Sequence, residues 1–500
     1  MHRPWTYERS SRPRFRLLSL ALLWVCAWPA PVGAANAVGP TVASYHVRFS
    51  SDPPRVTVSG TAPLEDGALR IDDSWPGDIP PLDSLGWCGL VRDLRVTDAD
   101  GGPLTLAANG PRGWKVARAG RTTVTFTYEV DYAQLGRLGW PAPREAAYQD
   151  ADDFVLVGRS LFAFTGASRE CRVTFELPEG WRASTAWPET ATPGSFVAST
   201  PRDLVENLVV LTRAPREDVV VGSFRVHVHA LGATRAFQPQ LRPMLERIVR
   251  HHVGMLGSPR RHDYALVLLP LPGGGGESYR GSFALCVDSL SDPQARAKLG
   301  NLVAHEIFHL WNGWMLRGAD YSSTQWFQEG FTEYVANLAM ARSGRVEPDW
   351  FRTKLAQHVT NSRQLTTSLE EIGTHKGPPL YSAGALVALE WDVRLRSATN
   401  GRRDLGDFFR ALLRRTDGGA KEYAWADLRA ALEETAPGDW DAFRQAYLRA
   451  MAPSPVEPAL AALGQRLIEP PTGPVRIEPD PAASKKARQR WNELLRSTRR

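Results

Sequence analysis

The sequence is poor in cysteine. Only four cysteines occur in 500 residues, and three of them, Cys88, Cys171 and Cys286, lie beyond residue 34. Three thiols can form at most one disulfide within the chain, which excludes a fold held by several bridges. They do not suggest a zinc site built from cysteines either. In an oxidising compartment we expect Cys88 to pair with Cys171, because both fall in the same predicted domain.

The central part of the chain also lacks an excess of positive charge. The whole sequence carries a net charge of +6, but residues 1–34 contribute +4 and the last sixteen residues contribute another +6. Residues 35–484 therefore carry −4. A segment with this net charge lacks the positive charge that nucleic-acid binding requires, so we exclude that class of partner.

No apolar run is long enough to cross a membrane. An uncharged run from Leu17 to Trp28 is interrupted by Pro29 and Pro31, well short of the ~20 residues that a spanning helix needs. Either Val32-Gly33-Ala34 or Ala35-Asn36-Ala37 suits a signal peptidase, and five arginines precede the run: Arg3, Arg9, Arg12, Arg14 and Arg16. We expect residues 1–34 to be a signal peptide and the chain to be exported, to the periplasm or outside the cell, with no stable membrane span.

The rest of the chain divides into two patterns. Strand-like alternation dominates up to about Ala230, as in Val124, Phe126, Tyr128 and Val130, with frequent Pro and Gly between the runs. Helical spacing follows from about Phe237. We therefore predict an α+β protein, in which an N-terminal antiparallel β-sandwich-like domain at residues 38–232 precedes a mainly helical domain at residues 233–452.

A metal-site motif lies in the helical part. His305 and His309 are four residues apart, so on a helix both imidazoles can reach one ion, and Glu306 projects about 100° away, where it can contact water at the metal. Asp292 and Pro293 are suited to begin this helix. Glu329, in a later amphipathic run, is the natural third ligand, because two histidines and one glutamate form an established catalytic zinc set.

These residues resemble a known family. The segments His305-Glu306-Ile307-Phe308-His309-Leu310-Trp311-Asn312 and Trp326-Phe327-Gln328-Glu329-Gly330-Phe331-Thr332 are similar to the glycyl aminopeptidase family of gluzincin zinc metallopeptidases, and more distantly to aminopeptidase N. The resemblance implies a thermolysin-like catalytic domain with one zinc ion per chain. It also implies peptide substrates with a small first residue, glycine or alanine. Many members carry a PDZ domain after the catalytic region, which we expect to be missing here.

The resemblance implies two further groups of site residues. Gly275, Gly276 and Glu277 match the segment that lines the substrate, where the glutamate receives the free amine, although Ser278 departs from the family pattern. Tyr381 matches the tyrosine whose hydroxyl donates to the oxyanion, although Ala383 stands where lysine is usual.

Several residues allow two interpretations. Glu333 follows Glu329 by one turn and can orient a ligand histidine, or it can be an ordinary surface glutamate. His227 and His229 alternate with apolar residues on a strand, so we expect them on a solvated polar face. For the whole chain, aminopeptidase activity is the leading hypothesis, with an endopeptidase on the same zinc site, or an inactive exported peptide-binding protein, as alternatives.

The C-terminal segment differs in composition. Residues 453–500 are rich in proline and then in basic residues, and we predict a disordered tail. Lys485 to Arg500 could form a short basic helix that contacts anionic surfaces, although simple solvation is the favoured interpretation.

Overall fold

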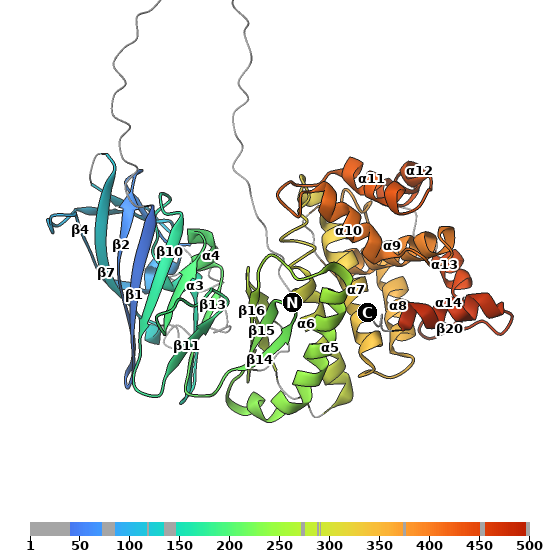
Figure 1. Ribbon diagram of the computed structural model, residues 1–500, viewed down its shortest axis with the longest axis horizontal. Helices are drawn as coiled ribbons and strands as arrows, with labels where there is room; N and C mark the ends of the chain where they lie inside the picture. The colour runs from blue at the N-terminus through green and yellow to red at the C-terminus, as the bar shows by residue number, and fades with distance from the viewer. Residues whose placement is uncertain are drawn as a thin grey trace, which may run out of the picture.

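The computed structural model describes residues 41–72, 86–117, 120–134, 147–271, 276–287, 290, 292–373, 377–450 and 456–496. The predicted signal peptide lies outside these ranges. A β-rich domain occupies one end of the molecule and a helical lobe the other, with a mixed sheet between them (Figure 1). The α+β class predicted from the sequence is confirmed.

The N-terminal domain is a sandwich whose buried residues alternate along the strands, as expected: Val124, Phe126, Tyr128 and Val130 all point inward from β7 (Thr122–Val130). One pair departs from the predicted antiparallel order, because β1 (Val42–Ser51) and β10 (Glu170–Glu176) run parallel. The larger sheet has the order β12 (Ser195–Ala198), β10 (Glu170–Glu176), β1 (Val42–Ser51), β2 (Pro54–Leu64), β7 (Thr122–Val130) and β4 (Val91–Thr97).

A second sheet packs on the first and shares its apolar core, which contains Val58 and Phe126 from one sheet and Leu156 and Val209 from the other. Its order is β11 (Arg182–Thr185), β13 (Leu208–Thr212), β9 (Asp153–Val157) and β8 (Ala147–Gln149). The domain also contains a small sheet of β3 (Ala68–Arg70), β6 (Gly113–Val116) and β5 (Leu106–Ala108), and the short helices η1 (Gly86–Leu90), α3 (Gly158–Leu161) and α4 (Pro201–Val205).

The predicted disulfide is wrong. Cys171 is fully buried in the sandwich core on β10, and Cys88 lies in η1, half-buried, with its Sγ 3.7 Å from the carbonyl of Pro111. Neither of them is in a disulfide. Membership of the same domain did not imply that the two thiols meet.

One sheet extends across the predicted boundary at residue 232. The middle sheet has the order β14 (Glu217–Val221), β15 (Phe224–Ala230), β16 (Asp263–Leu269), β18 (Ser282–Cys286) and β17 (Gly276–Ser278). Because β15 runs parallel to β16 and buries Phe224, Val226 and Val228 against the helices, β14 and β15 belong to the second domain.

His227 and His229 contradict the expectation of a solvated face. They are only 3% and 4% exposed. His227 lies between two carboxylates, 2.8 Å from Asp218 and 3.2 Å from Asp263, and Nε2 of His229 lies 3.0 Å from the hydroxyl of Ser184 on β11. The face of the sheet that carries them is covered, which the alternation along one strand could not reveal.

Helices cover the other face of the middle sheet and form one large apolar core. No helix among the described residues is both long and apolar enough to cross a membrane. In chain order the helices are η3 (Gly232–Phe237), α5 (Gln238–Leu256), α6 (Pro293–Phe308), η4 (Ser322–Thr324), η5 (Trp326–Phe331), α7 (Thr332–Ser343), α8 (Trp350–Ser362), α9 (Pro378–Ala398), α10 (Leu405–Arg415), α11 (Trp425–Thr435), α12 (Trp440–Arg444) and η6 (Gln445–Arg449).

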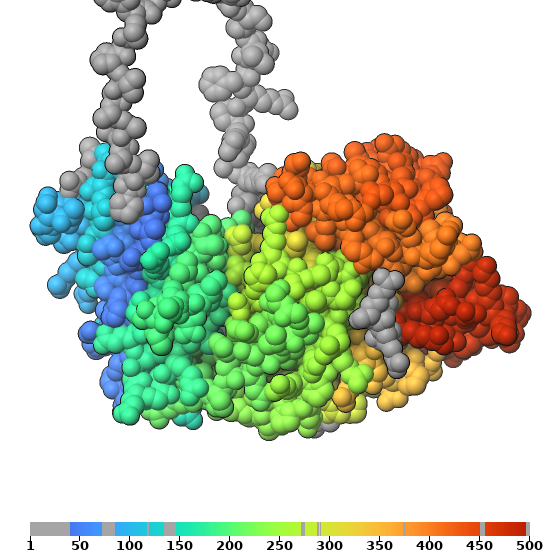
Figure 2. Space-filling view, in the orientation of Figure 1, coloured from blue at the N-terminus to red at the C-terminus, as the bar shows by residue number. Residues whose placement is uncertain are grey.

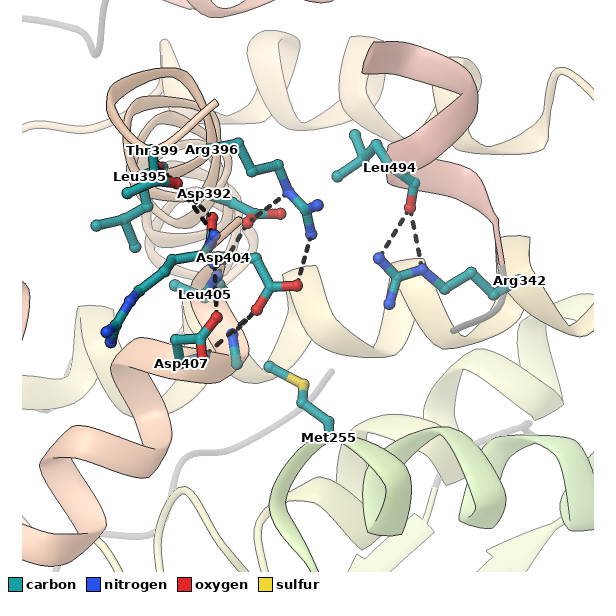
Figure 3. A network of polar contacts seen from close by, with 12 residues as sticks. Met255, Arg342, Asp392, Leu395, Arg396, Thr399, Asp404, Leu405, Asp407 and Leu494 are labelled. Atoms are coloured by element: carbon teal, nitrogen blue, oxygen red, sulfur yellow. Dashed lines mark hydrogen bonds and ion pairs between the residues drawn. The ribbon is translucent and has the colours of Figure 1, made fainter. Parts of the chain in front are cut away.

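A buried polar network holds this helical lobe together. The carboxylate of Asp392 on α9 accepts hydrogen bonds from Arg396 at 2.9 Å and from the backbone N–H of Leu405 at 3.0 Å (Figure 3). It also accepts one from the hydroxyl of Tyr334 on α7 at 2.9 Å. A single buried carboxylate with three donors therefore ties α7, α9 and the start of α10 together.

The prediction of a disordered tail is wrong for residues 456–496. They form α13 (Val456–Ala462), the hairpin β19 (Gln465–Ile468) and β20 (Arg476–Pro479), and α14 (Lys485–Leu495), which lie against the helical lobe (Figure 2). The ring of Trp491 packs 5.8 Å from that of Phe351, and Arg342 donates two hydrogen bonds to the carbonyl of Leu494 (Figure 3). The expected basic helix does form, and Lys485, Lys486 and Arg488 are exposed on it. Its contact with anionic surfaces stays a prediction.

Candidate metal centre

The first two candidate ligands lie at the end of α6. This helix begins as predicted, because the side chain of Asp292 accepts hydrogen bonds from the N–H groups of Gln294 and Ala295, and Pro293 occupies the first turn. His305 lies in the last turn, and His309 follows Phe308 with its backbone still helical. Both imidazoles therefore share one face of a helix that is buried along most of its length.

The third candidate ligand, Glu329, lies in a π-helical turn. The sequence predicted an ordinary amphipathic helix here, but Trp326–Phe331 is wound more widely before α7 continues. Such turns often occur at functional sites. Asn312, which follows the histidine motif, holds this turn in place, because its amide donates to the carbonyls of Phe327 and Gln328.

Two glycines bring α9 onto the π-helical turn. A Cβ atom on Gly330 would lie 2.3 Å from Cα of Gly384, and one on Gly384 would lie 2.2 Å from the carbonyl oxygen of Trp326. Only glycine permits this approach. Gly330 follows Glu329 directly and Gly384 lies one turn after Tyr381, so the contact places these two functional side chains next to each other.

The three ligand atoms converge. Nε2 of His305 lies 3.1 Å from Nε2 of His309, and each of these nitrogens lies 3.4 Å from Oε2 of Glu329. Ligands at 2.0–2.1 Å from a tetrahedral zinc ion are separated by about 3.3 Å, so these three atoms match one face of the coordination tetrahedron. No other group of three possible ligands in the described part of the chain converges in this way.

The outer ring nitrogens of both histidines already have partners. Nδ1 of His305 lies 3.1 Å from Oε2 of Glu333, and Nδ1 of His309 lies 2.9 Å from the backbone carbonyl of Asn312. Both are acceptors, so each Nδ1 donates its hydrogen and each Nε2 is left to face the metal position. Glu333 is thus placed to orient His305, and with a side chain 14% exposed it is not a solvated surface residue.

Electrostatics at the centre are dominated by carboxylates. Burial by itself lowers the pKa of His305, but hydrogen bonds to Glu329 and Glu333 outweigh it and raise this pKa to about 10. Burial raises the pKa of Glu333, but its contacts with His305 and His358 reverse the effect and hold this pKa far below its usual value. The surroundings therefore favour a positive charge at His305, as a metal cation would supply.

Sequence reasoning missed the residues that hold Glu333. The amide groups of Asn301 and Asn337 lie 3.2 Å and 2.9 Å from its Oε1, and Nε2 of the buried His358 lies 3.9 Å from the same atom. Asn301 lies one turn before His305, and Asn337 one turn after Glu333, so helical spacing from the motif was the available signal.

Glu306 and Tyr381 flank the ligands. Glu306 is half-buried, so its side chain is partly open to solvent. The ring of Tyr381 stacks on that of His305 at 5.7 Å, and its hydroxyl is hydrogen-bonded to Glu329. Burial, together with the charges of Glu329 and Glu306, raises the pKa of Tyr381 above its usual value, so the hydroxyl keeps its proton and remains a donor.

The predicted substrate segment forms the edge strand β17. Gly276 packs on the ring of Phe283, which would lie 2.4 Å from a Cβ atom at that position, so this glycine has a packing role. Glu277 is half-buried and lies opposite Ala284 in the pairing with β18. Gly275 lies outside the described residues.

Family models match two parts of the chain. Residues 86–210 match the Peptidase M61 N-terminal domain, and residues 298–372, which contain all three candidate ligands, match M61 glycyl aminopeptidase. Both matched regions are domains of the M61 glycyl aminopeptidase family. Together with the metal-ligand cluster, these domains identify the protein as a zinc metallopeptidase of the aminopeptidase type. No curated protein is similar enough in sequence to count as a match.

Solved structures share the fold of this chain. An aminopeptidase N family protein from Idiomarina loihiensis matches with a TM-score of 0.68 at 18% identity, over 85% of this chain and 79% of that one. An M1 zinc metallopeptidase from Deinococcus radiodurans matches with a TM-score of 0.51 at 16% identity, over 83% and 95% of the two chains. A variant of the latter, bound to a Tyr-Ser-Ala substrate, gives a TM-score of 0.51 at 14% identity.

Proposed function

We propose that this protein is an exported aminopeptidase that holds one zinc ion at His305, His309 and Glu329 and removes small residues, glycine or alanine, from the amino ends of peptides. The observation that carries the proposal is the convergence of three ligand atoms at 3.1–3.4 Å, with both outer ring nitrogens already occupied. The preference for small residues and the export are supported by the family resemblance and by the pattern of residues 1–34.

The side chains divide the chemistry between them. Bound zinc supplies a Lewis acid that polarises the scissile carbonyl and lowers the pKa of water. Glu306, beside the ligands, takes the proton from the attacking water and passes it to the leaving amine. The hydroxyl of Tyr381 donates to the oxyanion as negative charge develops there. Glu277 receives the free amino group of the substrate.

The first prediction separates binding from turnover. Glu306→Gln should keep the zinc content of the protein near that of the wild type and reduce kcat on an alanyl reporter substrate by several orders of magnitude, because the amide cannot take a proton. Zinc analysis and steady-state kinetics measure the two quantities. Glu347→Gln, a change in the loop between α7 and α8, is the matched control and should leave both unchanged.

The outcomes are distinct. Wild-type hydrolysis that a chelator abolishes and added zinc restores supports the proposal. An active Glu306→Gln variant would remove Glu306 from the mechanism. A wild-type protein that binds zinc and peptides without cleaving them would instead favour the inactive peptide-binding protein.

A further inference from the structure

Glu277, the proposed partner of the substrate's amino group, already faces a cation. Nη1 of Arg159 lies 3.6 Å from Oε1 of Glu277. Arg159 comes from α3 in the N-terminal domain, and Glu277 comes from β17 in the catalytic domain, so the pair bridges the two domains. The side chains are 9% and 18% exposed, which means that water screens their charges only in part.

The cation is held in place from several directions. A Cβ atom on Gly158 would lie 2.3 Å from the carbonyl oxygen of Leu204, so α3 packs tightly on α4, and the N–H of Gly158 donates to the carbonyl of Asn207 at 2.9 Å. The guanidinium of Arg159 lies over the ring of Tyr279, 5.2 Å from its centroid. Tyr279 is buried in the apolar cluster between the domains, so the guanidinium of Arg159 is held in a fixed position at this junction.

The geometry of strand β17 directs the side chain of Glu277 toward the N-terminal domain. Glu277 pairs with Ala284, whose side chain lies in the cluster between the domains, whereas Phe283 on the same strand lies in the core under the helices. Side chains of directly opposed residues share a face of the sheet. Glu277 therefore points toward the N-terminal domain and Arg159, and Ser278 points the other way.

We propose that Arg159 determines specificity at the amino end of the substrate, because it offsets the negative charge that Glu277 presents there. This inference rests on the proposed function, in which Glu277 receives the amine. A substrate ammonium group is attracted by the carboxylate and repelled by the guanidinium beside it. The pair thus holds a charged amine more weakly than Glu277 alone would, and it discriminates less against substrates whose amino end is capped.

A set of variants changes the charge of the pair stepwise. Relative to the wild type, Arg159→Met makes the pair more negative by one charge and Glu277→Gln makes it more positive by one. The double variant Arg159→Met/Glu277→Gln restores the original sum, and Arg159→Lys keeps it. Substrates are an alanyl reporter and its N-acetyl derivative at pH 7, where most α-amino groups are charged. The measured quantity is the ratio of kcat/KM for the free substrate to that for the capped one.

The preference for the free amine should follow the charge. We expect Arg159→Met to raise the ratio about tenfold, mainly through a lower KM for the alanyl substrate, and Glu277→Gln to lower it. The double variant and Arg159→Lys should stay within about threefold of the wild type. Where the capped compound is not cleaved, its inhibition constant replaces its kcat/KM. Circular dichroism and zinc content confirm that each variant is folded.

A kcat/KM ratio that does not rise in Arg159→Met overturns the inference. If Arg159 only orients Glu277, Arg159→Met should lower the ratio or leave it unchanged, and Arg159→Lys should rescue little. A wild-type protein that shows no chelator-sensitive hydrolysis would refute the proposed function itself. An active wild type whose variants do not follow the charge refutes the role of Arg159 alone.

Discussion

At the scale of single residues, the centre depends on side chains that fix other side chains. Glu333 and the carbonyl of Asn312 occupy the outer nitrogens of the two histidines, and Asn301 and Asn337 hold Glu333 in turn. Partners of this kind typically contribute 10–100-fold to metal affinity or activity. The metal position is therefore organised before any metal arrives.

Tyr381 provides a test at this scale. Tyr381→Phe removes the hydroxyl that is hydrogen-bonded to Glu329 but keeps the ring that stacks on His305. We expect kcat on an alanyl substrate to fall about 10²–10³-fold, with KM and zinc content nearly unchanged, because a donor to the oxyanion acts mainly in the transition state. Tyr447→Phe, which removes a hydroxyl from a ring that packs on Phe443, is the control. A kcat within twofold of wild type would exclude the role.

The pairing of His305 with His309 and the start of α6 were predictable because they depend on local spacing and capping, whereas the candidate ligand Glu329 followed from the two-histidine, one-glutamate zinc set. The partners of Glu333 were less predictable, because Asn301 and Asn337 are uncharged. Asn301 contacts Glu333 only because α6 and α7 pack side by side. His227 and His229 show the same limit, because their burial depends on a second domain that the alternation along β15 cannot report.

At the scale of secondary-structure elements, the contact between the π-helical turn and α9 sets the geometry of the site. The periodicity of residues 326–342 predicted a helix but not its wider winding, which depends on the packing of Gly330 against Gly384. The extension of one sheet across residue 232 and the ordered C-terminal segment were missed for a similar reason. Both depend on contacts between segments distant in sequence, here β15 with β16 and Trp491 with Phe351.

Gly384→Ala tests this contact. The added Cβ atom would meet the carbonyl of Trp326 at 2.2 Å, so α9 must shift away from the turn that carries Glu329. We expect the free energy of unfolding to fall by about 1–3 kcal/mol and zinc affinity to decrease. Gly254→Ala in α5 is the matched control, because nothing lies within 4 Å of its added Cβ atom and helix propensity should favour alanine. Equal loss of zinc affinity in both variants would contradict the prediction.

At the scale of the whole molecule, the two domains are joined by buried polar contacts as well as apolar ones. Asp153 on β9 is wholly buried and pairs with Arg235 from η3 in the second domain. Asp203 pairs with Arg261 in the same way, and the backbone N–H of Leu208 donates to the hydroxyl of Ser282 at 2.9 Å. A junction of this kind favours a fixed relation between the N-terminal domain and the metal centre.

The junction should weaken in acid. Burial, with smaller contributions from His227 and Arg216, lowers the pKa of His229 to about 3. In the unfolded chain this pKa is about 6.5, so between those values the unfolded state binds a proton that the native state does not. Stability is therefore complete above about pH 6.5 and falls as the pH decreases toward 3, by up to about 1.4 kcal/mol per pH unit from this residue.

Thermal unfolding between pH 7 and pH 5 measures this effect. His229→Gln, which can still hydrogen-bond to Ser184, should show a smaller decrease in Tm over that interval than the wild type. His46→Gln changes a histidine whose side chain is 45% exposed and serves as the control. Identical slopes in all three proteins would exclude His229 as a source of acid sensitivity.

The C-terminal helix α14 supports the far end of α7. Arg342, which holds the carbonyl of Leu494, lies near the end of α7, and the same helix carries Glu333 near its beginning. The last segment thus braces the element that orients His305. Truncation at the proline-rich stretch, where composition alone suggests a dispensable end, would uncover Phe351 and loosen, from its far end, the helix whose Glu333 orients His305.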